Sequence, residues 1–382
     1  MINRLRSTST FSPFQWMDLL GVGVSYLLLW TVGVWFIRLV MPENGLIVWS
    51  ISTLAFSGYA FGYLLKHMHL NTPQNGDRLF PDLGWANRIT LFRAGLLAWL
   101  FGFLFLPSLD GVVRWIPGIL YALVAVLDFV DGWVARITHR SSRLGEALDM
   151  HWDSLGVLIA CTLLVRLEQV PFPFLLVGLA RFLYVAGLRW RQRKRLPLAP
   201  LPFNPYRRYM AGIQMGFIAV VLLPVFSPPA TTVAAWLWMI PFLTAFLRDW
   251  LYVSMAMDEH SDPLFRWGVL AFLSRVFPPI FRLVTILSGG FLLVSLPPDF
   301  LPLWGRAIVV GLWLMVFSGI LGRVAGIGWM IMGGLAISVI PHQWEAWGAL
   351  VGGFGILMLG TGRLSVWTPE EWLIYHRAGE PS

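Results

Sequence analysis

The sequence predicts an all-α protein that crosses a membrane many times, and three observations carry this prediction. Of the 382 residues, 57% are hydrophobic and 13% are charged, whereas about a quarter of the residues of a soluble domain are charged. The apolar residues also gather in runs close to the roughly 20 residues that a helix needs to cross a bilayer. The 21 tryptophans fit the same class, because membrane interfaces favour this side chain.

Twelve apolar segments are the candidates for spanning helices. Their number is even, so both ends of the chain are expected on one side of the membrane. The first, near the N-terminus, is too long for a cleaved signal segment and is expected to be a retained helix. The segments are residues 17–39, 46–65, 89–107, 112–133, 153–169, 172–189, 210–227, 231–255, 279–297, 305–322, 324–341 and 346–362.

These helices are expected to form three parts. Residues 1–82 hold two helices and end in the polar linker HLNTPQNGDRLFPDLG. Residues 83–257 hold six helices and nearly all of the polar groups within the membrane, so we expect a six-helix catalytic bundle there. Residues 258–382 hold four helices that are rich in glycine and poor in acids, followed by a tail.

Basic residues predict the orientation. If the N-terminus lies in the cytoplasm, few Lys and Arg fall at outer helix ends, as the positive-inside rule requires. Those few are Arg38, Arg114, Arg166 and Arg306. The net charge of +8 then belongs to cytoplasmic loops that face anionic lipid, and no nucleic-acid partner is expected. We therefore expect a multi-pass protein of the cytoplasmic membrane.

The stretch LDFVDGWVARITHRSSRLGEALDMHWDSLG concentrates acids at the inner ends of two helices. Asp128 and Asp131 are three residues apart, and Asp149 and Asp153 are four apart, so each pair shares one helical face. A hairpin between the helices can bring the two faces together. Four close carboxylates resist ionisation unless a cation lies among them. Oxygen ligands of this kind suit Mg²⁺ or Mn²⁺ together with substrate phosphates.

Small and basic residues around these acids suggest room for a phosphorylated ligand. Gly132 and Gly145 would let a ligand approach the backbone, and Ala135 does much the same on the face of the first acid pair. Arg136 could bind phosphate. Ser142 could either contact a ligand or serve as the N-cap of the following helix, and the sequence leaves both roles open.

The pattern D-x2-D-G-x2-A-R-x8-G-x3-D-x3-D resembles that of the CDP-alcohol phosphotransferase family, and the resemblance covers roughly residues 83–257. The segment WANRITLFR adds to it, with Asn87, Thr90 and Arg93 in the expected places. The fixed positions of the pattern are Asp128, Asp131, Gly132, Ala135, Arg136, Gly145, Asp149 and Asp153.

This resemblance implies a role for each residue. Asp128, Asp131 and Asp149 would bind a pair of Mg²⁺ or Mn²⁺ ions, and Asp153 would be the catalytic general base and could also touch a metal. The resemblance also implies a homodimer. The implied CDP- and substrate-binding group consists of Gly132, Ala135, Arg136, Ser142, Gly145, Asn87, Thr90 and Arg93.

The implied reaction is the attack of an acceptor hydroxyl on the donor's β-phosphoryl group, with release of CMP, in phospholipid biosynthesis. The donor expected first is CDP-diacylglycerol, and the basic cluster RWRQRKR slightly favours it. The alternative is transfer of a choline- or ethanolamine-type headgroup to a lipid alcohol. Leu144, Gly145 and Glu146 favour this branch, as do Met150 and Ser154, where phosphatidylglycerophosphate synthases often have Pro and Lys.

Several residues outside the pattern have more than one possible role. Arg181, Arg207 and Arg208 are expected to bind an acceptor or phosphate group, although Arg181 could instead form a structural pair. The RWRQRKR cluster is expected mainly to fix topology. His139 and His151 are expected to be solvated spectators, and Cys161 a packed helix residue.

Two other classes of protein are compatible with intramembrane acids. A cation-coupled transporter also needs carboxylates, but near the midplane rather than at one inner helix boundary. A scaffold could leave the function to the flanking bundles, although an intact motif disfavours this.

Overall fold

A computed structural model describes residues 13–370, except 41–42, 75, 77, 107, 202–205, 258–268, 298 and 363–364; for 43–44, 206–209 and 269–275 it describes the backbone alone. The described residues are mostly helical and contain no strand beyond two isolated bridges. Nine helices in these ranges are long and apolar enough to cross a membrane, and three apolar helices are shorter. The predicted all-α, multi-pass class is therefore confirmed.

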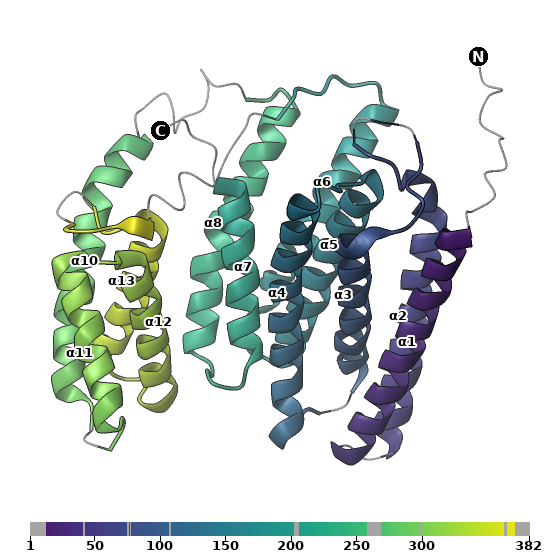
Figure 1. Cartoon of the computed structure of the whole chain (residues 1–382). Coiled ribbons are helices and arrows are strands. Elements are labelled where there is room, and N and C mark those ends of the chain that lie inside the picture. Colours follow the sequence, from purple (N-terminus) through teal and green to yellow (C-terminus); the bar gives the residue numbers. More distant parts are fainter. Residues whose placement is uncertain are drawn as a thin grey trace. The chain divides into compact units, whose positions relative to one another are not determined.

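Each of the twelve expected segments coincides with a helix of the described chain (Figure 1). Most boundaries agree within a few residues. The helices are α1 Pro13–Val40, α2 Glu43–His67, α3 Gly84–Gly102, α4 Ile116–Ile137, α5 Arg143–Arg166, α6 Leu175–Arg193, α7 Tyr206–Leu222, α8 Ala230–Val253, α10 Val269–Ser295, α11 Leu303–Ser318, α12 Gly322–Val339 and α13 Trp344–Leu359.

The starts of α5 and α10 differ most from the expected segments, because these helices begin at Arg143 and Val269 and not near residues 153 and 279. Ser142 has extended backbone and its hydroxyl accepts a hydrogen bond from the Gly145 amide, so it is the N-cap. The first turns of α5 are polar, and hydropathy alone therefore places the helix start too late.

The chain divides into two compact units. One comprises Met1–Leu167 and Met215–Pro224, and the other comprises Glu168–Gln214 and Val225–Ser382. Residues 83–257 contribute to both units. The expected three-part division by function remains a prediction.

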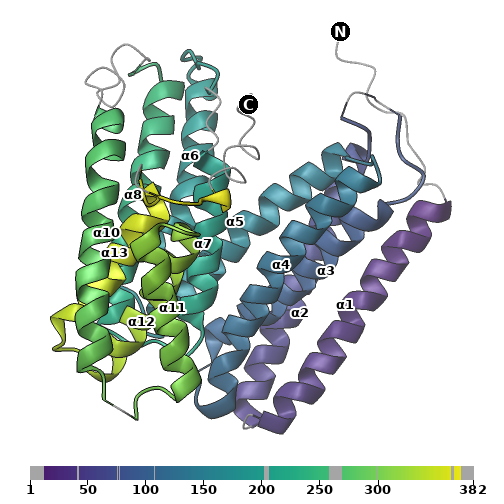
Figure 2. The same cartoon turned by 60° about the vertical axis from the view of Figure 1, so that its left-hand side comes forward.

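In the first unit, α3 is the central helix and packs against α1, α2, α4 and α5. Figure 2 shows these helices side by side from a second direction. Leu91, Ala94 and Leu97 lie on the buried surface of α3. At the other end of α5 from its N-cap, Arg166 donates hydrogen bonds to the carbonyl oxygens of Phe103 and Leu104, both at 2.8 Å. The acids of α4 and α5 are thus carried by helices that share α3.

The described part of the stretch between α2 and α3 is joined to this unit by hydrogen bonds. The Phe80 amide donates to the Asn71 carbonyl oxygen at 2.7 Å, and Asn71 Nδ2 donates to the Asp82 carbonyl oxygen at 3.0 Å. Asp82 pairs with Arg140 in the turn before α5. The hydrogen bond from the Arg140 guanidinium lowers the pKa of the Asp82 carboxyl below its ordinary value.

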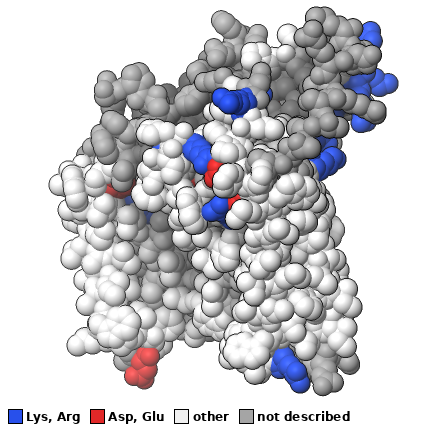
Figure 3. Space-filling view, turned by 45° about the vertical axis from the view of Figure 1, so that its right-hand side comes forward, with Lys and Arg blue, Asp and Glu red and all other residues white. Residues whose placement is uncertain are grey.

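In the second unit, helices α10 to α13 pack through small residues. A side chain on Gly353 of α13 would begin 2.6 Å from the Gly326 carbonyl oxygen of α12, so these helices meet backbone to backbone. Trp329 and Leu350 belong to the buried apolar core of these helices. On the face shown in Figure 3, the described charged side chains gather in the upper part and at the lower edge, and the described surface between these two places is uncharged.

Candidate active site

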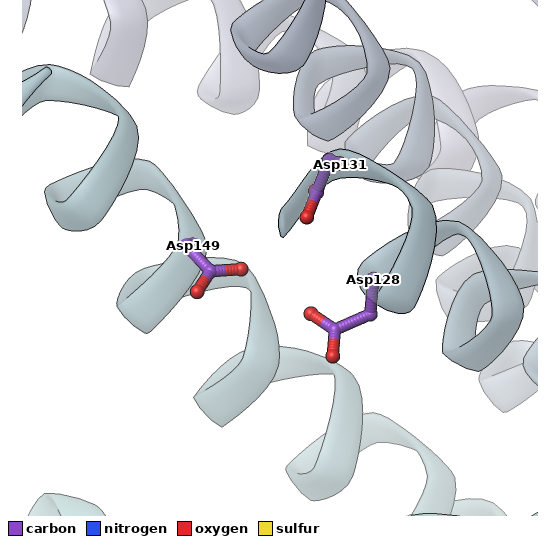
Figure 4. A group of neighbouring side chains, drawn as sticks. All are labelled: Asp128, Asp131 and Asp149. Carbon is purple, nitrogen blue, oxygen red and sulfur yellow. The ribbon is translucent and has the colours of Figure 1, made fainter. Parts of the chain in front are cut away.

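The acids of the sequence motif come together between α4 and α5. One carboxylate oxygen each from Asp128, Asp131 and Asp149 lies within 4.8 Å of the others. Figure 4 shows the three side chains pointing into a common space, two from α4 and one from α5. Asp131 is buried, while Asp128 and Asp149 are partly exposed. The predicted convergence of the two helical faces is confirmed for these three residues.

Arg93 of α3 lies at the centre of this group. Its guanidinium forms ion pairs with Asp128, with Asp131 at 3.5 Å, with Asp149 at 2.8 Å and with Asp153 at 3.0 Å. The Arg93 side chain is fully buried. A buried guanidinium is costly unless anionic partners surround it, and four carboxylates are costly without a cation, so each stabilises the other.

Two polar residues one turn apart on α3 extend this network. Thr90 Oγ1 donates to Asp131 Oδ2 at 2.8 Å and so orients the buried carboxylate. Asn87 Nδ2 donates to the Ser142 hydroxyl at 3.1 Å and to the Leu83 carbonyl oxygen at 2.8 Å. One face of α3 therefore reaches both the acids of α4 and the N-cap of α5.

The two glycines of the motif have different surroundings. A Cβ on Gly145 would lie 2.5 Å from Asn87 Oδ1, so this position is small to admit the asparagine. A Cβ on Gly132 would meet only Arg136 Nη1, at 3.4 Å. The missing side chain of Gly132 therefore leaves open space beside the acids, which Arg136 borders. Ala135 is half-buried on the same helix.

The donor set fits a hard divalent cation. Three carboxylates converge, and Mg²⁺ and Mn²⁺ prefer oxygen ligands. Arg93 already supplies one positive charge. Its guanidinium pairs with one oxygen of each carboxylate, so the second oxygen of each acid is not part of these ion pairs. The site can therefore bind a divalent ion in addition to the guanidinium.

The structure adds less about the residues expected to bind an acceptor. Arg181 is half-buried on α6, in the second compact unit. The side chains of Arg207 and Arg208 lie outside the described residues. Their expected contacts with phosphate stay predictions.

The expectation that His151 is a solvated spectator was wrong. The expectation that Cys161 is a packed helix residue is confirmed by its full burial. His151 is half-buried on α5, its ring stacked on Tyr63 of α2 and its Nε2 hydrogen-bonded to the Tyr59 hydroxyl. His139, in the turn after α4, is exposed as expected. One sequence feature could have indicated this packing. Tyr59, Tyr63 and His67 are spaced four residues apart, so their rings share one face of α2.

The fold and the site together define a multi-pass membrane protein with an acidic centre that can hold a divalent ion. Residues 83–247 match the model of the CDP-alcohol phosphatidyltransferase family, so the chain carries a domain of that family. The match agrees with the resemblance of the motif and includes all four aspartates.

A curated relative is the "Choline/ethanolaminephosphotransferase 2" of Arabidopsis thaliana, 36% identical over 107 residues. The similarity covers 26% of this chain and 28% of the relative, so the chain spans less than a third of that protein's length in the comparison. No solved structure matches the chain.

Proposed function

We propose that this protein transfers a phosphoalcohol group from a CDP-linked donor to a hydroxyl acceptor and releases CMP, as a step of phospholipid biosynthesis. The observation that carries the proposal is the convergence of Asp128, Asp131 and Asp149 within a domain of the CDP-alcohol phosphatidyltransferase family. Such an enzyme belongs to the transferases of other substituted phosphate groups.

The acids would divide the work between metal binding and proton transfer. Asp128, Asp131 and Asp149 would hold two Mg²⁺ or Mn²⁺ ions, with Asp153 at their edge. Bound divalent ions neutralise a diphosphate and stabilise the CMP leaving group. The Gly132 surface is open, and it would admit the donor beside Arg136, whose guanidinium suits a phosphate.

Asp153 would act as the general base. Its carboxylate would accept the proton of the acceptor hydroxyl, and the hydroxyl oxygen would then form a bond to the β-phosphorus of the donor. The bond from that phosphorus to the CMP oxygen breaks, and CMP leaves with its electron pair. Asp153 Oδ1 lies 3.0 Å from Arg93 Nη2. This ion pair would hold the carboxylate in position before it accepts the proton.

Two donor classes have separate support. CDP-diacylglycerol with a small, phosphorylated alcohol is favoured by the basic cluster from Arg189 to Arg195, at and just after the end of α6. Transfer of a CDP-linked headgroup to a lipid alcohol is favoured by the name of the plant relative and by the Leu144-Gly145-Glu146 sequence. Either version places a lipid in the reaction.

The proposal also covers the setting of the enzyme. The catalytic part would comprise residues 83–257, flanked by membrane parts 1–82 and 258–382. The active site would face the cytoplasm, the membrane would be the cytoplasmic one, and the enzyme would act as a homodimer. Arg181, Arg207 and Arg208 would contact the acceptor or its phosphate.

Release of CMP from radiolabelled donors tests the proposal. Membranes containing the protein would receive CDP-diacylglycerol with soluble alcohols in one arm, and CDP-choline or CDP-ethanolamine with diacylglycerol in the other. We expect Mg²⁺- or Mn²⁺-dependent CMP release in one arm, abolished by Asp153→Asn and unchanged by Asp110→Asn, which alters an exposed acid of the connection before α4. Ion flux in liposomes with no CMP release would instead support a transporter and overturn the proposal.

A further inference from the structure

Helix α5 has a second face, which the N-terminal helices cover. Asp149 and Asp153 share the face that meets Arg93. His151 lies between them in sequence, about 200° around the helix from Asp149 at 3.6 residues per turn. Its ring therefore points away from the acids, towards α2, and any rotation of α5 about its axis moves both sides together.

The contact between His151 and α2 is specific in geometry. The Tyr59 hydroxyl and His151 Nε2 are hydrogen-bonded at 2.7 Å. The rings of Tyr63 and His151 stack with centroids 3.9 Å apart and planes 6° apart. Tyr63 also stacks on His67, at 4.1 Å. Next to His151, the buried Trp152 ring meets Tyr63 edge-on at 5.6 Å.

The connection after α2 holds the beginning of α5. The Arg143 amide, in the first turn of α5, donates to the Thr72 carbonyl oxygen at 3.0 Å. Pro73 and Ser142 form an isolated antiparallel bridge beside this hydrogen bond. The N-terminal part of the chain thus contacts α5 at its N-cap and again two turns further on.

Helix α1 holds α3 in the same manner. Asp18 accepts a hydrogen bond from the Leu83 amide at 2.7 Å and pairs with Arg88 at 2.6 Å. The Tyr26 hydroxyl donates to the Leu91 carbonyl oxygen at 3.0 Å. Arg93 follows two residues later, so both helices that meet at the Arg93 ion pairs with Asp149 and Asp153 contact residues 13–82.

We propose that residues 13–82 position the acidic site, with Tyr59 and Tyr63 as positioning residues that set the rotation of α5 through His151. This inference rests on the proposed function, because it assigns the metal-holding role to Asp149. Without the stack, α5 can turn and carry Asp149 away from Asp128 and Asp131. The N-terminal helices would then act on the site without touching the substrate.

Binding of Mn²⁺ to the full-length protein, followed by the paramagnetic resonance signal of the free ion, tests this directly. Tyr63→Leu removes the stacked ring, and an aromatic pair contributes enough that we expect Mn²⁺ to bind about fivefold more weakly. Tyr63→Phe keeps the ring and should bind Mn²⁺ as tightly as the unaltered protein. Trp35→Leu removes a lipid-exposed aromatic from α1 and should leave binding unchanged.

The outcomes separate this inference from the proposed function. If the unaltered protein neither binds Mn²⁺ nor releases CMP, the proposed function fails. If the unaltered protein binds Mn²⁺ and Tyr63→Leu binds it equally well, the positioning role is overturned. If Tyr63→Leu does not fold, Tyr59→Phe removes only the hydroxyl bonded to His151 and should weaken Mn²⁺ binding about twofold. Unchanged binding in Tyr59→Phe would then count against the inference.

Discussion

Two buried arginines in different parts of the molecule differ in the groups that their guanidinium contacts. Arg93 of α3 is fully buried and forms ion pairs with four aspartates. Arg323 of α12 is 6% exposed, and its Nη1 donates to the carbonyl oxygens of Leu357 at 2.7 Å and Met358 at 3.4 Å. Those carbonyls belong to the last turn of α13, where the helix leaves such groups without partners of its own.

The comparison separates a site from a scaffold. Around Arg93 the protein concentrates four carboxylates, more than one guanidinium pairs with in charge, and such a group of oxygen ligands suits a divalent cation. Around Arg323 the guanidinium donates to carbonyl oxygens at a helix end, in a bundle packed through glycines, and one carboxylate, that of Glu370, accepts a hydrogen bond from the Arg323 backbone amide at 3.3 Å. A buried arginine in a membrane protein therefore indicates function through the charge of its neighbours, and burial alone does not.

The largest effect is expected from Arg93→Met, which leaves four acids without their guanidinium. Breaking one partner of a buried charge pair costs about 3–5 kcal/mol. We expect the melting temperature in EDTA to fall sharply and to recover in part when Mg²⁺ or Mn²⁺ is added. Arg93→Lys, which keeps a charge, should lose less. If Arg93→Met had the same melting temperature in EDTA as the unaltered protein, Arg93 would not be what stabilises the four acids.

Arg323→Met is the counterpart in the scaffold. It should cost about 1.5–3 kcal/mol, the range for a hydrogen bond from a charged donor. Thermal unfolding should show this loss without any recovery on adding divalent ions. CMP release by the protein that remains folded should stay near its normal rate. Recovery by Mn²⁺ would mean that the two arginines do not differ as described.

Thr90→Val refines the same comparison within the site. It keeps the side-chain shape and removes the hydrogen bond to Asp131. We expect about a tenfold loss in kcat/KM, which corresponds to roughly 1.4 kcal/mol. The loss should be smaller at saturating Mn²⁺, because the ion also orients the carboxylate. Thr90→Ser retains the hydroxyl and is the control; equal losses in both variants would show that the hydrogen bond is not the cause.

The smallest effect is expected at the partly exposed pair of Asp82 and Arg140. The hydrogen bond from Arg140 lowers the pKa of Asp82 below its ordinary value of 3.8. The stabilisation is therefore fully present above that ordinary pKa and is lost as the pH falls through the lower pKa of the folded state. Asp82→Asn should cost less than about 1 kcal/mol, since the pair is partly exposed.

Thermal unfolding of Asp82→Asn and the unaltered protein at several pH values checks this sign. The two melting temperatures should differ most near pH 7 and approach each other below the ordinary pKa of the carboxyl. A difference that does not change with pH would assign the effect to packing.

Hydropathy predicted the helices, and the spacing of the acids predicted their convergence, because both depend on residues close in sequence. The sequence placed Arg93 with the substrate-binding residues, but its neighbours come from α4 and α5, 35 to 60 residues away, and local patterns carry no such information. The stack of Tyr63 on His151 was missed for the same reason. The start of α5 was misplaced because its first turns are polar and not apolar.

Helix α5 is held at both of its ends, by the hydrogen bond from Arg143 to Thr72 and by those from Arg166 to Phe103 and Leu104. A slide of one helical turn, about 5.4 Å, would break both connections. With the stack of Tyr63 on His151 also in place, the wall of the site that α5 provides therefore adjusts to its ligands by side-chain rotation and not by shifts of the whole helix. Amide hydrogens in the middle of α5 should accordingly exchange among the slowest in the first unit.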